Sequence, residues 1–261
     1  MRRTVSMAAM LMLGPLVMAP LVPVAGCGDP SEAERFDVPV QLVPPTEAVT
    51  TDLGYTVTLT GLRAAVANFR FTVEGEIDAR APVLFGASTA LAHPGHFQGG
   101  EVTGEMLGDY VIDWFADDRT LGIAQLIGTE YNAADIDLRT FEGEGPLNGH
   151  TAIVEGQAVR GDDTVSFTVA VDAPEGRAII GIPFEATVGA ETSALLFSFL
   201  MDDPFEDDTL FDGVDFAALA SEGTLVLNAA SADDAATAYA AVRRAFLSHD
   251  HTLFQAAEAI R

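Results

Sequence analysis

The chain has 261 residues, and its 39 acidic residues far outnumber its 13 basic ones, which gives a formal net charge of −26 at pH 7. All of the basic residues are arginines. A field of that sign repels nucleic acid phosphates, so nucleic acid binding is excluded as a function.

The first 26 residues have the features of a secretion signal. Arg2 and Arg3 form a short basic start, and an apolar run follows from about residue 7 to residue 26. Prolines interrupt this run, which argues against a stable membrane-spanning helix. We therefore expect residues 1–26 to be a signal peptide, and no later segment has the length and apolarity that a membrane span needs.

The signal ends in Val24-Ala25-Gly26-Cys27, and Cys27 is the only cysteine of the chain. This tetrad resembles the lipobox of bacterial lipoproteins, where the signal is cut before the cysteine and the cysteine is acylated. The resemblance implies a lipid anchor at Cys27 in the bacterial cell envelope, with residues 27–35 as a tether. Gly28, in the position after the cysteine, favours the outer membrane over the inner membrane. The alternative is an ordinary signal peptide followed by a free thiol.

Residues 36–261 are expected to form a single β-rich domain. Apolar and polar residues alternate with period two in several short runs, as in half-buried strands. These runs cover residues 55–60, 69–73, 135–138, 165–171, 180–188 and 195–199. Many short strands with few helices between them favour a mainly β fold, an antiparallel β-sandwich or an open barrel. We expect Trp114 to lie in its core.

The C-terminal fifth has a helical pattern instead. Ser231 is the expected cap of a helix over about 232–247, in which acidic residues occupy the first turn and apolar residues recur at helical spacing. A shorter helical segment is expected from Leu253 to Ile260. The β-rich domain should therefore carry one or two C-terminal helices.

Four of the five histidines form two short pairs, His93-Pro94-Gly95-His96 and His249-Asp250-His251. Proline and glycine in the centre of the first motif predict a type II turn, which brings its first and last Cα atoms within about 7 Å. His249 and His251 share a face only if their backbone is extended, which the expected end of the helix near Leu247 allows. Because imidazole is a common ligand of zinc and copper, the pairs could supply four ligands, or three and an open position.

Three further residues are weaker candidates for the same site. Glu101 and Glu105 follow the first pair and could supply carboxylate ligands, and His150 could supply another imidazole. Imidazole and carboxylate ligands without a thiolate suit zinc or Cu(II). The alternative is that the first motif is a plain surface turn and the second a polar connector. The acidic run 202–208 does not have the spacing of an EF-hand loop, so calcium is not expected.

The exported, strand-rich and histidine-bearing organisation resembles periplasmic copper-binding proteins of methanobactin-type uptake systems, although the cysteines of many of those proteins are missing here. The run Leu53-Gly-Tyr-Thr-Val-Thr-Leu-Thr60, followed by a His-x-x-His loop, is also similar to uncharacterised bacterial lipoproteins. Both resemblances imply that the histidine loop binds a metal ion.

The sequence thus predicts a lipid-anchored envelope protein that binds zinc or Cu(II), for capture, buffering or delivery to a metal transporter. An enzyme is not expected, because the nucleophile and zinc-protease motifs Gly-x-Ser-x-Gly, Ser-x-x-Lys and His-Glu-x-x-His are missing. A zinc hydrolase with Glu101 or Glu105 as base is a minor alternative. The competing hypothesis is a metal-free envelope lipoprotein that binds another protein or a glycan.

Overall fold

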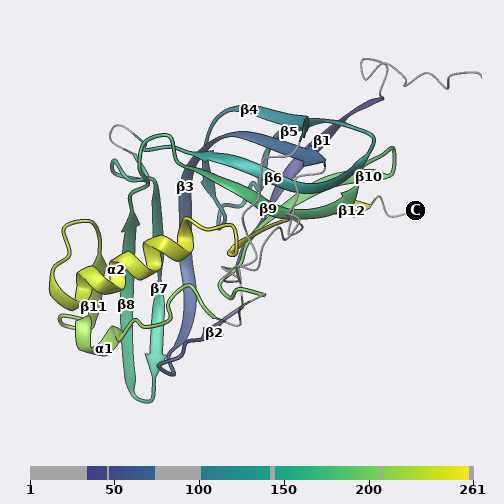
Figure 1. Ribbon diagram of the computed structural model, residues 1–261. Coiled ribbons are helices and arrows are strands. Elements are labelled where there is room, and N and C mark those ends of the chain that lie inside the picture. The colour runs from purple at the N-terminus through teal and green to yellow at the C-terminus, as the bar shows by residue number, and fades with distance from the viewer. Residues whose placement is uncertain are drawn as a thin grey trace, which may run out of the picture. The chain divides into compact units, whose positions relative to one another are not determined.

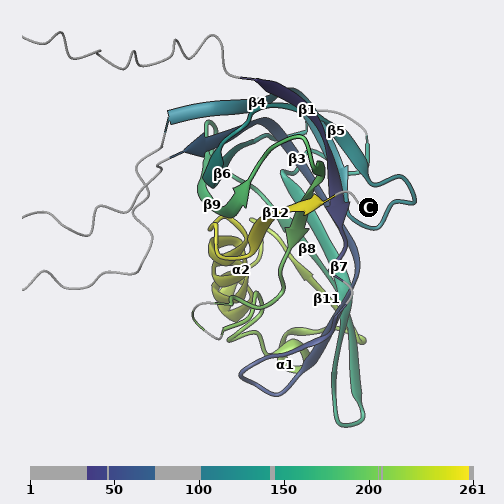
Figure 2. The same ribbon diagram turned by 90° about the vertical axis from the view of Figure 1, so that its right-hand side faces the viewer.

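The computed structural model describes residues 34–45, 47–73, 101–141, 145–204, 206 and 208–258. The predicted signal peptide, Cys27, His93 and His96 lie outside the described residues. Residues Glu34–Arg261 form one compact unit, which Figures 1 and 2 show from two sides.

Within the described residues, twelve strands belong to one mixed sheet, and two helices accompany it. The strands are β1 (Arg35–Val43), β2 (Val49–Thr50), β3 (Thr56–Val73), β4 (Glu101–Asp113), β5 (Thr120–Ile127), β6 (Glu130–Leu138), β7 (Ala152–Arg160), β8 (Asp163–Val171), β9 (Ala178–Thr187), β10 (Thr192–Phe199), β11 (Thr224–Leu227) and β12 (Thr252–Glu258); the helices are α1 (Phe216–Leu219) and α2 (Asp233–Phe246). The main path through the sheet is β11-β8-β7-β3-β4-β5-β1-β10-β12, while β2 and β6 also pair with β3, and β9 pairs with β6. Two pairs, β1 with β10 and β8 with β11, are parallel. The predicted mainly β fold with a helix near the C-terminus is confirmed, and the sheet is not closed into a barrel.

The longest strand, β3, joins two regions of the sheet that are built differently. Its first half pairs with β7 through residues 56–64, and its second half pairs with β4 and β6 through residues 63–73. Asn68 has a φ of 49°, at a point where the pairing of β3 with β4 shifts its register. A bulge of this kind bends a strand and increases its twist. The two halves of β3 therefore belong to differently shaped parts of the sheet.

We call the first part the curved region. It consists of the second half of β3 with β4, β5, β1, β10 and β12 on one side and β6 and β9 on the other (Figures 1 and 2). Strands β9 and β12 lie side by side, but no ladder joins them within the described residues. The interior is filled by buried aromatic rings that contact one another, namely Phe69, Phe71, Tyr131, Phe184, Phe197 and Phe254. Trp114 packs beside Phe197, so its predicted place in the core is confirmed.

We call the second part the helix-covered region. Here α2 lies across β7 and β8, and α1 lies near the far end of the same strands (Figures 1 and 2). The Phe216 ring of α1 packs against Tyr55 and Phe167, with centroids 5.2 Å apart in both pairs. Val242 and Phe246 are buried residues of α2. An amphipathic helix therefore covers this face of the sheet, as its apolar spacing predicts.

Two predictions near the C-terminus are wrong, although the helix predicted over about 232–247 is confirmed as α2. The described part of the segment predicted as a short helix, residues 253–258, is a strand instead: β12 pairs with β10. The strand forms because Phe254 stacks on Phe197 of β10, with ring centroids 4.5 Å apart, and completes the aromatic interior. Ser231 does not cap α2 either. The N-cap is Ala232, which makes no side-chain cap, and the Ser231 hydroxyl accepts the backbone N–H of Asn228.

Candidate functional site

The predicted histidine loop lies between two strands that pair with each other. His93 and His96 are outside the described residues, while Val73 at the end of β3 and Glu101 at the start of β4 are partners in the ladder. Glu101 and Glu105 are both exposed. Two solvent-facing carboxylates therefore follow the loop closely in the chain.

These two carboxylates have different neighbours. Glu105 lies opposite Arg70 in the ladder. The pKa of the Arg70 guanidinium is raised chiefly by its hydrogen bonds to Asp137, and the charge of Glu105 adds to this effect. Glu101 lies opposite the apolar Val73. Because Glu101 faces no cation across the ladder within the described residues, it is the better of the two candidate ligands.

The second histidine pair forms the turn between α2 and β12. The backbone N–H of Thr252 donates to the carbonyl of His249 at 3.1 Å, so the extended conformation expected for this pair is wrong. The chain turns here because it must reverse between the end of α2 and the start of β12. The Nε2 atom of His249 lies 3.1 Å from Oδ1 of Asp250, which gives this imidazole a partner within the turn.

His251 is part of the packed interior. Only 3% of the residue is exposed, and its ring lies against that of Phe199. Its Nδ1 atom lies 3.1 Å from the carbonyl oxygen of Leu200. A contact from one ring nitrogen to a backbone carbonyl is also common for metal-bound histidine, but here the burial of the ring favours a structural role.

His150, the weaker histidine candidate, pairs with a carboxylate. Its Nδ1 atom lies 2.7 Å from Oδ1 of Asp172, which follows directly after β8. The backbone carbonyl of His150 also accepts the N–H of Phe141. These contacts connect the segment before β7 to the end of β8, which favours a structural role for His150.

No group of three or more histidine, cysteine, aspartate or glutamate side chains is gathered as a metal site among the residues that the structure describes. His93 and His96 are not among them. The predicted loop site therefore stays a prediction. What the structure adds is that His150, His249 and His251 each have a local partner of their own.

The acidic segment around residues 202–215 lies near His251. Desolvation of the carboxyl group and the charge of Asp203 raise the pKa of Asp208, and the charge of His251 acts in the opposite direction. The carboxylate of Asp212 accepts the backbone N–H groups of Thr209 and Asp52, both at 3.0 Å. These bonds order the acidic segment and connect it to the turn before β3, which favours a structural role over a calcium site.

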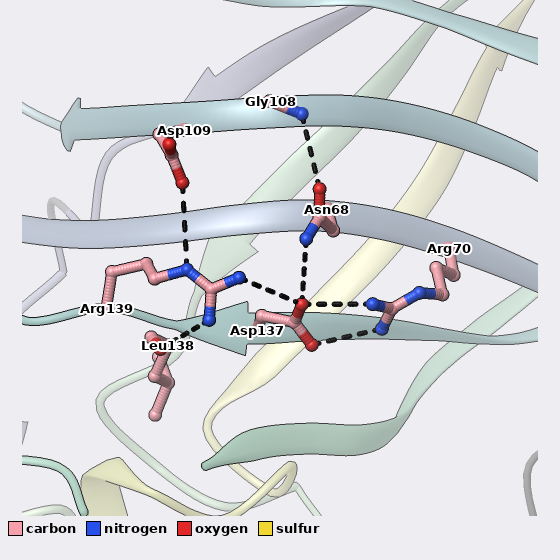
Figure 3. A network of polar contacts seen from close by, with 7 residues as sticks. All are labelled: Asn68, Arg70, Gly108, Asp109, Asp137, Leu138 and Arg139. Carbon is pink, nitrogen blue, oxygen red and sulfur yellow. Dashed lines mark hydrogen bonds and ion pairs between the residues drawn. The ribbon is translucent and has the colours of Figure 1, made fainter. Parts of the chain in front are cut away.

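A polar network that the sequence analysis did not predict ties β3 to β6 (Figure 3). The two terminal nitrogens of Arg70 donate to the two oxygens of Asp137, at 3.0 and 2.9 Å. The amide nitrogen of Asn68 donates to the same carboxylate at 2.9 Å, and Arg139 donates at 3.4 Å. The alternation over 135–138 predicted the strand that carries Asp137, but sequence spacing alone gave no sign of its partners on β3.

The network continues to β4 and controls the charge of its central carboxylate. The side-chain oxygen of Asn68 accepts the backbone N–H of Gly108, and Nε of Arg139 lies 3.6 Å from a carboxylate oxygen of Asp109 (Figure 3). Burial would raise the pKa of Asp137, but the hydrogen bonds from Arg70 and Asn68 outweigh it and lower that pKa. The carboxylate is thus held ionised between its donors.

Arg139 also lines two open pockets. One has a volume of about 480 Å³ and is lined by Ala65, Val66, Asp109, Tyr110, Val111, Arg139, Thr140 and Phe141. The other has a volume of about 400 Å³ and lies towards the turn at Pro174. The lining of the first is mostly apolar and includes one carboxylate and one guanidinium, a composition that suits recognition better than catalysis.

Within the described residues, no helix is long and apolar enough to span a membrane. Comparisons of the chain with models of protein families, with curated proteins and with solved structures give no match.

Proposed function

We propose that this protein is a lipid-anchored protein of the bacterial cell envelope that binds a divalent transition metal ion, zinc or Cu(II), for capture, buffering or delivery to a transporter. The observation that carries the proposal is the motif His93-Pro94-Gly95-His96, which leads directly into β4. The first two acidic residues of that strand, Glu101 and Glu105, are exposed. Two imidazoles and a carboxylate are a ligand set that suits either ion.

The contacts of the other histidines narrow this proposal. His251 is buried and His249 lies against Asp250 in the turn. A site that used them would have to disturb packing or an existing pair. We therefore centre the metal site on His93 and His96 with Glu101, and we assign structural roles to His249 and His251. The large negative charge adds a long-range attraction for cations.

The location rests on the N-terminal residues. Val24-Ala25-Gly26-Cys27 supports acylation of Cys27, and Gly28 supports the outer membrane as the destination. A lipid anchor would hold a metal-binding domain at the membrane, where a transporter could receive the ion. Mass spectrometry of Cys27 in the native membrane fraction tests this part by itself.

Metal content tests the binding proposal. The chain from Gly28 onward retains the whole compact unit and is purified without a histidine tag. It is incubated with zinc or copper and desalted, and metal is measured per chain. We expect near-stoichiometric metal, and we expect it to be lost in the variant His93→Ala/His96→Ala. Glu101→Gln should weaken retention more than Glu105→Gln.

His150→Gln and His249→Gln are the matched controls, because each removes one imidazole that already has a carboxylate neighbour. Both should keep their metal. The proposal is wrong if the wild-type protein stays empty, or if the controls lose as much metal as the loop variant. If the wild-type protein bound no metal but Cys27 were acylated, the alternative function would be favoured, a metal-free lipoprotein that binds another protein or a glycan.

A further inference from the structure

The outer face of the curved region carries exposed aliphatic side chains on neighbouring strands. Leu107 of β4 is 57% exposed and Ile123 of β5 is 60% exposed. Pro39 of β1 pairs with Ile123 in the ladder and is half-buried. Large apolar side chains exposed next to one another on a sheet are a mark of an interaction surface.

The strand register places these residues on one face. In β4 and β5, the neighbours Met106 and Ala124 are buried in the core, so Leu107 and Ile123 point away from it. Glu105 pairs with Gln125, and the next outward positions along the two strands are Leu107 and Ile123. The three strands β4, β5 and β1 lie side by side in Figure 2. Leu107, Ile123 and Pro39 therefore form a row across them, which we call the aliphatic row.

The same face leads along β4 to the pocket beside Arg139. Val111 is 41% exposed, points outward opposite Ala65 of β3, and lines the pocket of about 480 Å³ together with Tyr110 and Phe141. An apolar pocket next to an exposed apolar row can receive one anchoring side chain of a partner, while the row contacts its neighbours. Interfaces commonly concentrate their binding energy at such an anchor.

Three exposed carboxylates lie around this surface. Glu105 and Asp109 flank Leu107 on β4, and Asp37 lies on the same face of β1, opposite Gln125; all three are exposed. Two of the nearby cations are already engaged: Arg70 and Arg139 both donate to Asp137, and Arg139 also lies 3.6 Å from Asp109. Arg35 is an exposed cation on the same face of β1 as Asp37. With a net charge of −26, the chain repels a second copy of itself and anionic lipid. The charge around the row therefore suits a positively charged partner.

We propose that the aliphatic row and the pocket at Val111 form a docking surface for a protein segment whose aliphatic side chains are flanked by arginine or lysine. One apolar side chain of the segment enters the pocket, its neighbours cover Leu107 and Ile123, and its cations lie against Glu105 and Asp37. This surface needs no metal ion, so the inference is independent of the metal-binding proposal.

The test uses two short synthetic peptides, one alternating leucine with arginine and its twin alternating leucine with glutamate. Each is titrated into the isotope-labelled chain from Gly28 onward, and amide chemical shifts are followed by NMR. We expect the arginine peptide to shift resonances of β4, β5 and the pocket, with binding that weakens as salt is added. The glutamate peptide should cause no saturable shifts.

The variant Leu107→Ser/Ile123→Ser should weaken binding of the arginine peptide by roughly tenfold or more. The variant Ile180→Ser/Val226→Ser is the matched control, because these residues are 46% and 56% exposed on β9 and β11, away from the row. It should bind like the wild type. Both variants replace exposed residues, so both should keep the dispersed spectrum of the folded chain.

Three results would overturn the proposal. The first is equal binding of the two peptides, and the second is a set of shifts that lies outside β4, β5, β1 and the pocket. The third is an equal loss of binding in both serine variants. Two controls without peptide identify another occupant, and either result would also overturn the proposal. Line broadening that grows with protein concentration would indicate a second copy, and broadening only after vesicles of zwitterionic lipid are added would indicate a membrane.

Discussion

The curved region and the helix-covered region use the same strand, β3, but build their cores differently. In the curved region, buried rings from strands far apart in the sequence meet in the interior. The ring of Phe254, for example, contacts four others, those of Phe69, Phe71, Phe184 and Phe197. In the helix-covered region, the sheet packs against α2 and against Phe216 of α1. Because strands form both walls of the curved region, its outer faces are left open to solvent on β4 and β5.

The difference teaches where function can reside in this fold. The helix-covered region places an amphipathic helix over the sheet face that needs covering. In the curved region, aromatic rings fill the interior, so no helix is needed to cover it. Its outer face carries the aliphatic row and the Asp137 network, and it includes β4, the strand that follows the histidine loop. Both proposals of function fall on the curved region for this reason.

The largest expected effect comes from the aromatic interior. Phe254→Ala should lower the free energy of unfolding by about 3–5 kcal/mol, because it removes a fully buried ring and leaves a cavity between four others. Urea unfolding followed by circular dichroism measures this change. Ile123→Ala, in the same region but exposed, is the control and should change stability by no more than about 0.5 kcal/mol. A loss below about 1 kcal/mol in Phe254→Ala would mean that the rings do not form the core described here.

The Asp137 network should contribute less to the free energy of unfolding than the aromatic interior does. Asp137→Ala leaves Arg70 and Asn68 without their common acceptor, and we expect a loss of about 2 kcal/mol, reduced from the value of a fully buried charged pair because Arg70 is about one-third exposed. Asp37→Ala, an exposed carboxylate of the same curved region, is the control. Equal stabilities of the two variants in urea would show that the network does not tie β3 to β6.

The free energy of unfolding should change with pH in two opposite ways, which we call the neutral limb and the acid limb. Burial raises the pKa of Asp135, so the ionised carboxylate destabilises the folded protein, and this cost is relieved as the pH falls through that pKa. The hydrogen bond from Tyr55 lowers the pKa of Asp215, and donors lower that of Asp137, so their contributions are lost as the pH falls. We therefore expect stability to rise as the pH falls through the raised pKa of Asp135, and to decrease again once the pH drops below about 4, the ordinary carboxyl range.

Asp135→Asn separates the two limbs. The amide oxygen can still accept the backbone N–H of Gly181, which donates to Asp135 at 2.9 Å, but the titrating group is gone. In this variant the rise of the unfolding free energy on acidification from neutral pH should be smaller than in the wild type, while the decrease below about pH 4 should remain. A steeper change in the variant would contradict the assignment.

The smallest expected effect concerns the start of α2. Its N-cap, Ala232, has no side chain that can accept a hydrogen bond. Ala232→Ser should therefore stabilise the protein by about 0.5–1 kcal/mol. Ala220→Ser, at the end of α1, is the control and should have little effect in the same thermal unfolding experiment. A destabilised Ala232→Ser would show that the backbone at Asp233, where φ is 51°, does not permit the cap.

Periodicity predicted much of the fold because strands buried on one face alternate strictly in sequence. It identified β8, β9 and β10 and, through helical spacing, α2. It failed at β12, where Gln255, Ala256 and Ala257 have high helix propensity. The contact that decides the conformation, Phe254 with Phe197, involves a distant strand. Tertiary packing overrides local propensity in such short segments.

The candidate site was less predictable, because the sequence around a polar side chain does not indicate which distant residue it will contact. Neither the burial of His251 against Phe199 nor the pairing of His150 with Asp172 follows from the spacing of the histidines. The Asp137 network depends on Asn68 and Arg70, which lie far from it in the sequence. Only the motif at His93 and His96 is local enough to suggest its chemistry directly.

X-ray absorption spectroscopy of the zinc-loaded chain tests the metal-binding claim most directly, because it reports the ligands themselves. The account predicts nitrogen and oxygen neighbours with the multiple-scattering pattern of about two imidazoles, and it predicts that this pattern disappears in His93→Ala/His96→Ala but remains in His249→Gln. A spectrum of oxygen neighbours alone, or an imidazole pattern unchanged in the loop variant, would contradict it.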